Sequence, residues 1–116
     1  MPIYEIRYKN RKLWGGKRIV EEANIQRAFL KAHNVRDEEP DIEAIREIAS
    51  KKEDLKYALS TAFLNIANYG SAGTDLTDTW GELHPQDISV LRTLLSSIRE
   101  WADRVDTYLR AYEDLF

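Results

Sequence analysis

The feature that most constrains this chain is an unbroken heptad pattern from Pro85 to Phe116. Apolar residues recur there at alternating spacings of three and four, with no glycine or internal proline between them: Ile88, Leu91, Leu95, Ile98, Ala102, Val105, Leu109, Tyr112 and Phe116. This spacing predicts one C-terminal helix of about 30 residues and roughly 46 Å. Because a compact chain of this length is only about 35 Å across, we expect the helix to exceed what a spherical fold covers.

The apolar stripe of this helix is wider than one heptad seam. A flanking column of large residues, each seven after the last, runs beside it: Leu94, Trp101, Tyr108 and Leu115. A stripe of this width needs neighbours on two sides. Two interpretations stay open, because either the chain's own short helices and hairpin fill the second side or a homodimer packs along it. We therefore take the column as the candidate oligomer interface.

The N-terminal segment has the pattern of a β-hairpin. Residues 3–8 alternate between two faces, with Tyr4, Ile6 and Tyr8 on one and Glu5 and Arg7 on the other. This alternation predicts a half-buried strand. Residues 17–21 form a second β-type stretch after a polar connection that contains two glycines. An antiparallel pair is only marginally stable in water, so we expect the hairpin to lean on a helix or on another chain.

A short helix is expected next, over residues 25–34. Asn24 is suited to the N-cap, because its side-chain oxygen can accept a hydrogen bond from the first turn. The order of strand, strand and helix predicts that Phe29 covers the apolar face of the hairpin. Residues 36–40 are typical of a linker, and Pro40 suits the first turn of the helix that comes after it.

The middle of the chain predicts two more helices. Ile42, Ile45 and Ile48 recur every three residues and favour a helix over 41–49. A further helix is expected over 51–69, opened by a Ser50–Glu53 capping box and stopped by a left-handed Gly70. One bent helix over both ranges is the alternative.

Residues 70–84 are then expected to form a loop that is long for a helix–helix connection, and whether it binds a ligand stays open. Its acidic residues, Asp75, Asp78 and Glu82, lack the oxygen spacing of a calcium loop, so we expect no metal site. The stretch Ser71 to Thr74 resembles an anion-binding turn without the lysine of a phosphate-binding loop. We expect Leu76, Trp80 and Leu83 to attach the loop to the core, and His84 to start the last helix.

The fold class is therefore α+β and predominantly α-helical. It consists of an N-terminal antiparallel β-hairpin, short helices, and a long antiparallel helical hairpin that ends in the C-terminal helix. At 116 residues the chain is expected to be one domain, with a part over 1–34 and a helical part over 41–116.

Composition narrows the class of protein. With 43% hydrophobic and 32% charged residues, the chain matches neither disordered nor membrane proteins. It has no cysteine, which excludes disulfides, a thiolate nucleophile and a cysteine-based zinc site. No secretory signal pattern is visible, so a cytoplasmic location is expected, in the host cytoplasm if the protein is viral.

The charges are distributed unevenly. Residues 1–32 hold eight Lys or Arg against three acids, whereas the remainder is acidic. The basic residues of the hairpin are interleaved with an aromatic residue and form the candidate partner-binding set: Arg7, Lys9, Arg11, Lys12, Trp14, Lys17 and Arg18. Three interpretations stay open: an acidic protein partner, a nucleic acid, or a solvated strand edge that blocks unwanted pairing.

No catalytic constellation is visible. The two histidines, His33 and His84, belong to no shared motif. We therefore expect a non-enzymatic protein without cofactor that acts stoichiometrically on a macromolecule, with a protein as the preferred partner. Small cysteine-free chains of this kind are often phage or mobile-element inhibitors of host defence machinery. The alternatives are nucleic-acid binding through the hairpin and sequestration of a small ligand, such as a nucleotide, by a homo-oligomer.

Overall fold

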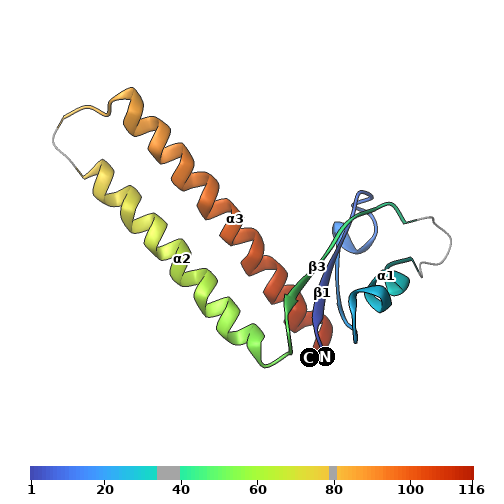
Figure 1. Cartoon of the computed structure of the whole chain (residues 1–116). Helices are drawn as coiled ribbons and strands as arrows, with labels where there is room; N and C mark the ends of the chain where they lie inside the picture. Colours follow the sequence, from blue (N-terminus) through green and yellow to red (C-terminus); the bar gives the residue numbers. More distant parts are fainter. Residues whose placement is uncertain (34–39, 79–80) are drawn as a thin grey trace. The chain divides into compact units, whose positions relative to one another are not determined.

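The computed structural model describes residues 1–33, 40–78 and 81–116, and within them the chain divides into two compact units. Unit 1 comprises Met1–Ala58 and Thr107–Phe116, and unit 2 comprises Leu59–Asp106. The elements follow in the order β1 (Ile3–Tyr8), the 3₁₀ turn η1 (Trp14–Gly16), β2 (Lys17–Glu21), α1 (Ile25–His33), β3 (Ile42–Ala49), α2 (Asp54–Thr77) and α3 (Pro85–Leu115) (Figure 1). The predicted α+β, mostly helical class is confirmed.

Unit 1 is built on an antiparallel sheet whose strand order is β2-β1-β3. The predicted hairpin of β1 and β2 is confirmed, with Tyr4 opposite Val20 and Ile6 opposite Arg18. The prediction that β1 is half-buried is wrong, because Glu5 on its supposed polar face is 0% exposed. β1 is a central strand that is covered on both faces, so a polar residue in it needs buried partners.

The two faces of the sheet carry separate hydrophobic cores. The first core combines residues of the sheet with two alanines of α1: Tyr4, Ile6, Tyr8, Val20, Ala28 and Ala32. The second core combines the opposite face with the first turn of α2 and the end of α3: Ile3, Ile19, Leu55 and Ala111. The last turns of α3 therefore cover one face of the sheet, although α3 lies far from these strands in the sequence.

The helix predicted over 41–49 is wrong, because these residues form β3. The pairing of β3 with β1 contains two β-bulges, at Glu43 and Ile48, where β3 has one residue more than its neighbour. A bulge reverses the alternation of side chains. Ile42 and Ile45 therefore both pack on the first core although they are three residues apart. The bulges explain why the apolar residues of this strand have a spacing that is typical of a helix.

α1 confirms the predicted short helix and its cap. The side-chain oxygen of Asn24 accepts a hydrogen bond from the backbone N–H of Arg27, at 2.9 Å. The predicted role of Phe29 is wrong, because Ala28 and Ala32 cover the sheet and Phe29 is 50% exposed. Small side chains allow the helix to approach the sheet closely. The predicted linker over 36–40 lies, except for Pro40, outside the described residues; Pro40 precedes β3 rather than a helix.

α2 differs from the helix predicted over 51–69 at both ends. It begins at Asp54, where the hydroxyl of Ser50 donates a hydrogen bond to the Asp54 carboxylate at 2.7 Å, in place of the predicted capping box. It continues through Gly70, which does not have a positive φ angle. An interior glycine costs about 1 kcal/mol of helix stability, and packing offsets a cost of that size.

Hydroxyl groups support the last turns of α2. Thr74 and Thr77 donate hydrogen bonds to the carbonyl oxygens of Gly70 and Gly73, four residues earlier. The prediction of a loop over 70–84 is therefore wrong up to Thr77, and Ser71 to Thr74, which resemble an anion-binding turn in sequence, lie within α2.

α3 confirms the predicted uninterrupted C-terminal helix. His84 caps it, because its backbone N–H donates a hydrogen bond to the carboxylate of Asp87 at 2.9 Å while its carbonyl accepts from the first turn. Among the described helices, none combines the length and the apolar composition needed to cross a bilayer.

Unit 2 is an antiparallel pair formed by most of α2 and α3 (Figure 1). Ala62 of α2 and Val105 of α3 are buried in it. Gly73 faces α3, and a Cβ there would make an ordinary contact with Cδ1 of Leu94 at 3.9 Å. Most other apolar side chains of this pair are half-buried or exposed.

Candidate functional site

The turn between β1 and β2 holds Trp14 in an uncommon backbone conformation. Trp14 has a φ angle of 48°, and among the described residues it is the non-glycine residue with positive φ. Gly15 and Gly16 follow with φ angles of 68° and 89°. Asn10 starts the turn by accepting a hydrogen bond from the backbone N–H of Lys12 at 3.0 Å. Strained residues of this kind persist where the surroundings hold them, and they gather at functional sites.

Three groups hold Trp14 in place. Its indole stacks on Tyr8 with the ring centroids 5.6 Å apart, and the Arg18 guanidinium lies 4.4 Å from the indole centroid. Its carbonyl oxygen accepts a hydrogen bond from Arg110 of α3. Gly15 lies beside that guanidinium, and its φ angle of 68° favours glycine, although a Cβ there would meet the guanidinium at an ordinary 3.5 Å. Trp14 is thus ordered while 41% of it remains exposed.

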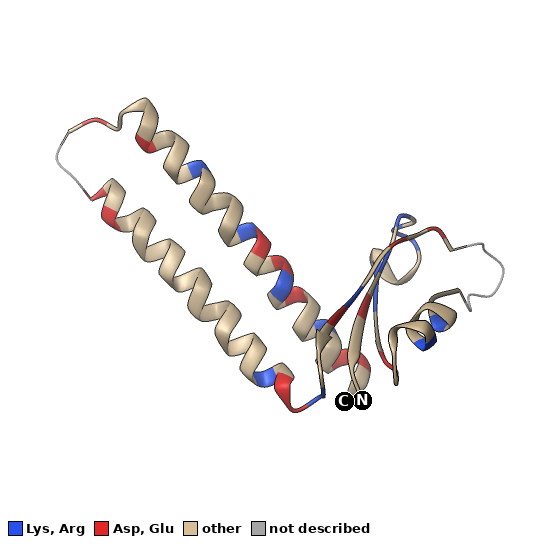
Figure 2. Ribbon diagram, viewed as in Figure 1, with Lys and Arg blue, Asp and Glu red and all other residues tan. Residues whose placement is uncertain are grey.

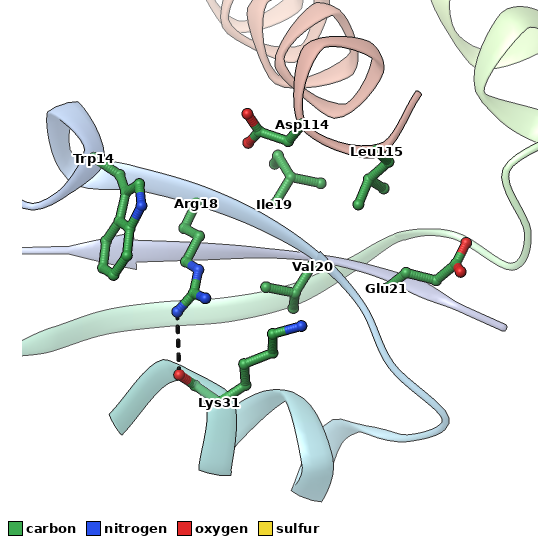
Figure 3. Close-up of a pocket in the computed structure, with 8 residues that line it drawn as sticks. All are labelled: Trp14, Arg18, Ile19, Val20, Glu21, Lys31, Asp114 and Leu115. Carbon is green, nitrogen blue, oxygen red and sulfur yellow. Dashed lines mark hydrogen bonds between the residues drawn. The ribbon is translucent and has the colours of Figure 1, made fainter. Parts of the chain in front are cut away.

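A pocket of about 350 Å³ lies beside this residue, in the size range of small-molecule and side-chain anchor sites. We call it the Trp14 pocket. Figure 3 shows its lining, with the cations and carboxylates around an aliphatic floor: Trp14, Arg18, Ile19, Val20, Glu21, Lys31, Asp114 and Leu115. Arg18 donates a hydrogen bond to the carbonyl oxygen of Lys31 at 3.2 Å, which ties β2 to α1. The pocket therefore offers both signs of charge and an apolar floor.

The exposed side of α1 is unusually apolar. While two alanines pack on the sheet, three large side chains project outward: Ile25 is 48% exposed, Phe29 50% and Leu30 69%. They line a second open pocket of about 400 Å³ together with Gln26. Phe29 is partly ordered by an edge-on contact with the His33 ring at 4.4 Å. We call Ile25, Phe29 and Leu30 the α1 patch.

The predicted partner-binding residues separate into three groups. Lys9, Arg11 and Lys12 are exposed on the turn between β1 and β2, where Figure 2 shows basic residues gathered. Trp14 and Arg18 line the Trp14 pocket. Arg7 and Lys17 instead turn toward Glu5, and Lys17 is buried. Lys17 is therefore not available to a partner, because its ammonium group serves the interior of unit 1.

Glu5 is the centre of a buried ionic cluster that the sequence did not reveal. Its carboxylate accepts hydrogen bonds from Arg7 and Arg46, both at 2.8 Å, and from the Thr107 hydroxyl. Lys17 lies 3.6 Å from the carboxylate and donates to the Thr107 hydroxyl at 2.8 Å. Burial raises the pKa of Glu5, but hydrogen bonds from Arg7 and Thr107 and the charges of Arg46 and Arg7 outweigh it, so the pKa lies below its usual value.

This cluster holds the sheet to α3 within unit 1. Both carboxylate oxygens of Glu5 are engaged, and among the described residues no buried side-chain nitrogen or oxygen lacks a hydrogen-bond partner. A catalytic carboxylate would need an approach for substrate, which a fully buried group with these partners does not offer. The role of Glu5 is structural.

The predicted oligomer column is used within the chain. Tyr108 and Leu115 pack against the second core of unit 1. Leu94 faces Gly73 of α2 in unit 2. Trp101 is half-buried and carries the Arg104 guanidinium 4.3 Å from its ring centroid. These contacts fit the intrachain interpretation, and a dimer interface along this column stays a prediction.

The acidic residues of the predicted loop over 70–84 lie on different elements. Asp75 lies on α2, while Glu82 and His84 precede α3. Trp80, expected to attach the loop to the core, is outside the described residues, and Leu83 is exposed. In residues 1–33, 40–78 and 81–116, no group of three or more His, Asp or Glu side chains is placed to hold a metal ion.

The α1 patch is the part of this site that the sequence interpretation missed. Ala28 and Ala32, four residues apart, were the available signal, since a helix that packs closely on a sheet presents its smallest side chains. We instead expected the largest side chain to face the core. Comparison with protein-family models, with curated proteins and with solved structures gives no match, so a function for this chain has to be inferred from the geometry of the site.

Proposed function

We propose that this chain is a non-enzymatic protein that binds another protein stoichiometrically, through the Trp14 pocket and the α1 patch of unit 1. The observation that carries the proposal is the inverted packing of α1, which buries two alanines and exposes three large apolar side chains. Exposed apolar residues of this size mark interaction sites more often than chance positions on a surface.

The chemistry of the surface defines the partner. Trp and Arg are enriched among residues that dominate binding energy, and Trp14 is already ordered by Tyr8 and Arg18 before a partner arrives. The α1 patch requires apolar side chains opposite it. Lys31 and the exposed basic residues of the β1–β2 turn require acidic groups around them. We infer a partner with an apolar anchor inside an acidic rim.

A nucleic acid is the competing partner, and the exposed basic turn beside Trp14 favours it. Glu21 and Asp114 in the Trp14 pocket oppose it, because carboxylates repel phosphate. The two differ in salt dependence. Nucleic-acid affinity falls steeply with salt, whereas an interface led by the α1 patch weakens little.

The test begins with capture from the native cell, using the wild type and the variants Trp14→Ala and Phe29→Ala side by side. Tyr57→Ala is the matched control, since Tyr57 is 78% exposed on α2 outside the α1 patch and the Trp14 pocket. The captured protein is then titrated calorimetrically. We expect one partner per chain, a loss of about 30-fold in affinity for each site variant, and no loss for the control.

Circular dichroism and urea unfolding establish that the variants are folded. If the wild type captures no protein, or if both site variants bind as tightly as the control, the proposal is wrong. Capture of nucleic acid with a steep salt dependence would establish the competing function instead. Inhibition of host machinery, which we propose as the biological role, is tested by measuring the captured protein's activity with and without this chain.

A further inference from the structure

The middle of α2 is free of charge on every side. Residues 57–74 contain no Asp, Glu, Lys, Arg or His over five helical turns, as Figure 2 shows by the uniform tan of this stretch. A surface helix normally presents charged residues to solvent, so the apolar residues of an uncharged stretch indicate faces that other elements cover. Unit 2 supplies only α3 as a neighbour among its described residues.

One side of α2 is accounted for by α3. Half-buried or buried residues recur along it at spacings of three and four, and they form the seam of the pair: Leu59, Ala62, Ile66, Tyr69, Gly73 and Leu76. The matching residues of α3 are Leu91, Leu94, Ile98, Trp101 and Val105. Contact of Gly73 with both Leu91 and Leu94 shows that these two rows face each other.

The next columns of both helices are exposed and apolar. On α2, Phe63 is 53% exposed and Leu64 is 61% exposed; on α3, Ile88 and Leu95 are 40% and 43% exposed. Phe63 follows a seam residue by one position, and so does Leu95. In an antiparallel pair, residues in that position flank the seam on the same side. Both helices therefore contribute to one continuous face of unit 2.

We name this surface the hairpin face, and it consists of Phe63, Ala67 and Gly70 on α2 and Ile88, Arg92, Leu95, Arg99 and Ala102 on α3. We propose that a second copy of this chain covers it, so that two helical pairs form a four-helix bundle. The proposal is independent of the protein-binding function proposed for unit 1.

The size of the hairpin face suits a stable dimer. Nineteen residues of α2 lie in unit 2, which at about 1.5 Å each gives roughly 28 Å of helix. Two helices about 10 Å wide give a footprint of roughly 560 Å². Interdigitated side chains bury more than the flat footprint, so each copy approaches the 800 Å² or so that a standard interface buries per partner.

Charge fixes how two copies meet. The α2 half of the hairpin face carries no charge, whereas Arg92 and Arg99 each follow a seam residue and lie in its α3 half. Around a two-fold axis these arginines avoid like charges when α3 of one copy lies beside α2 of the other, which is the arrangement we propose.

Sedimentation equilibrium and light scattering of the full chain test the proposal. We expect the wild type to be a dimer at low micromolar concentration. Phe63→Glu and Leu95→Glu, which place a charge in the hairpin face, should weaken dimerisation by about 100-fold or more. Ser96→Glu is the matched control, since Ser96 is exposed on α3 next to Leu95 but outside the face, and it should leave the dimer intact.

Two further measurements make the outcome decisive. Circular dichroism shows whether the glutamate variants keep their helices. The second measurement separates the two proposals: Trp14→Ala must remain dimeric, and the glutamate variants must keep their affinity for the captured partner. A wild type that is monomeric at every concentration overturns the proposal, as does dimerisation that survives both glutamates. Binding of the monomer to lipid vesicles or to an unlike protein through this face would likewise overturn it.

Discussion

The carboxylate of Glu5 joins parts of unit 1 that lie far apart in the sequence. It accepts hydrogen bonds from Arg46 on β3 and from Thr107 on α3, besides Arg7 on its own strand. A buried carboxylate without such partners would be neutral or strongly destabilising. In this sheet the ion is retained because three cations surround it.

The low pKa of Glu5 predicts how stability depends on pH. The unfolded chain takes up the Glu5 proton near pH 4.5, before the folded chain does. The contribution of Glu5 to the free energy of unfolding is therefore complete above pH 4.5 and is lost as the pH falls below that value. Glu5→Gln should lower the free energy of unfolding by about 3 kcal/mol at pH 7, because it leaves the buried ammonium group of Lys17 without its carboxylate and removes the acceptor of Arg7 and Arg46.

Urea unfolding at a series of pH values checks this prediction. The difference between wild type and Glu5→Gln should shrink as the pH falls below 4.5. Glu43→Gln, an exposed carboxylate on β3, serves as the control and should change stability little at any pH. A difference that stays constant into acid would show that folding does not lower the pKa of Glu5.

At the level of elements, sequence periodicity identified the long helices, the first hairpin and the N-cap at Asn24. These depend on local rules: a heptad repeat, strict alternation, and an Asx side chain before an apolar run. The predictions failed where the structure of a segment depends on contacts with residues distant in the sequence. Bulges in β3 depend on pairing with β1, and the burial of Glu5 depends on a third strand that pattern alone did not place.

The proposed binding surface was predicted less completely than the fold. Trp14 and Arg18 were included in the prediction because aromatic and cationic residues stand out in a short stretch. Lys17 was misassigned, because a strand's two faces are equivalent in sequence until their coverings are known. The α1 patch was missed because the orientation of a short helix depends on how closely it approaches the sheet.

Replacing a glycine of unit 2 by alanine is expected to change stability in opposite directions at two positions, because their backbone conformations differ. Gly73→Ala should stabilise the chain by about 1 kcal/mol, because alanine favours a helix and its Cβ meets Leu94 at an ordinary 3.9 Å. Gly81→Ala should destabilise it by about 1 kcal/mol, because φ is 106° although the space is open.

Thermal or urea unfolding of both variants checks these signs. The pair is a matched control, since each adds the same methyl group. Stabilisation by alanine at 81, or destabilisation at 73, would contradict the helix boundary at Thr77 and the left-handed turn before α3.

For the molecule as a whole, the two units differ in how much they bury. β1 of unit 1 is covered on both faces, whereas unit 2 buries few side chains completely among its described residues. Regions with few buried contacts open at lower free energy. We expect the slowest amide hydrogen exchange in β1 and faster exchange in the part of α2 within unit 2.

Hydrogen-exchange mass spectrometry at two protein concentrations measures both effects. Protection of residues 59–77 should rise with concentration if a second copy covers the hairpin face, and Leu95→Glu should abolish that rise. Protection of β1 should be the same at both concentrations. Equal protection of the two units would contradict the ranking by burial.

The second core has a consequence for how the protein is made. Ile3 lies in it with Ala111, so a strand that leaves the ribosome early packs against a helical turn that is synthesised much later. A nascent chain in which residues 107–116 have not yet emerged holds β1 with one face bare and Glu5 without its threonine. Vectorial synthesis therefore leaves this sheet unfinished until the end of α3 is available, and chaperones that shield emerging strands have that whole interval in which to act.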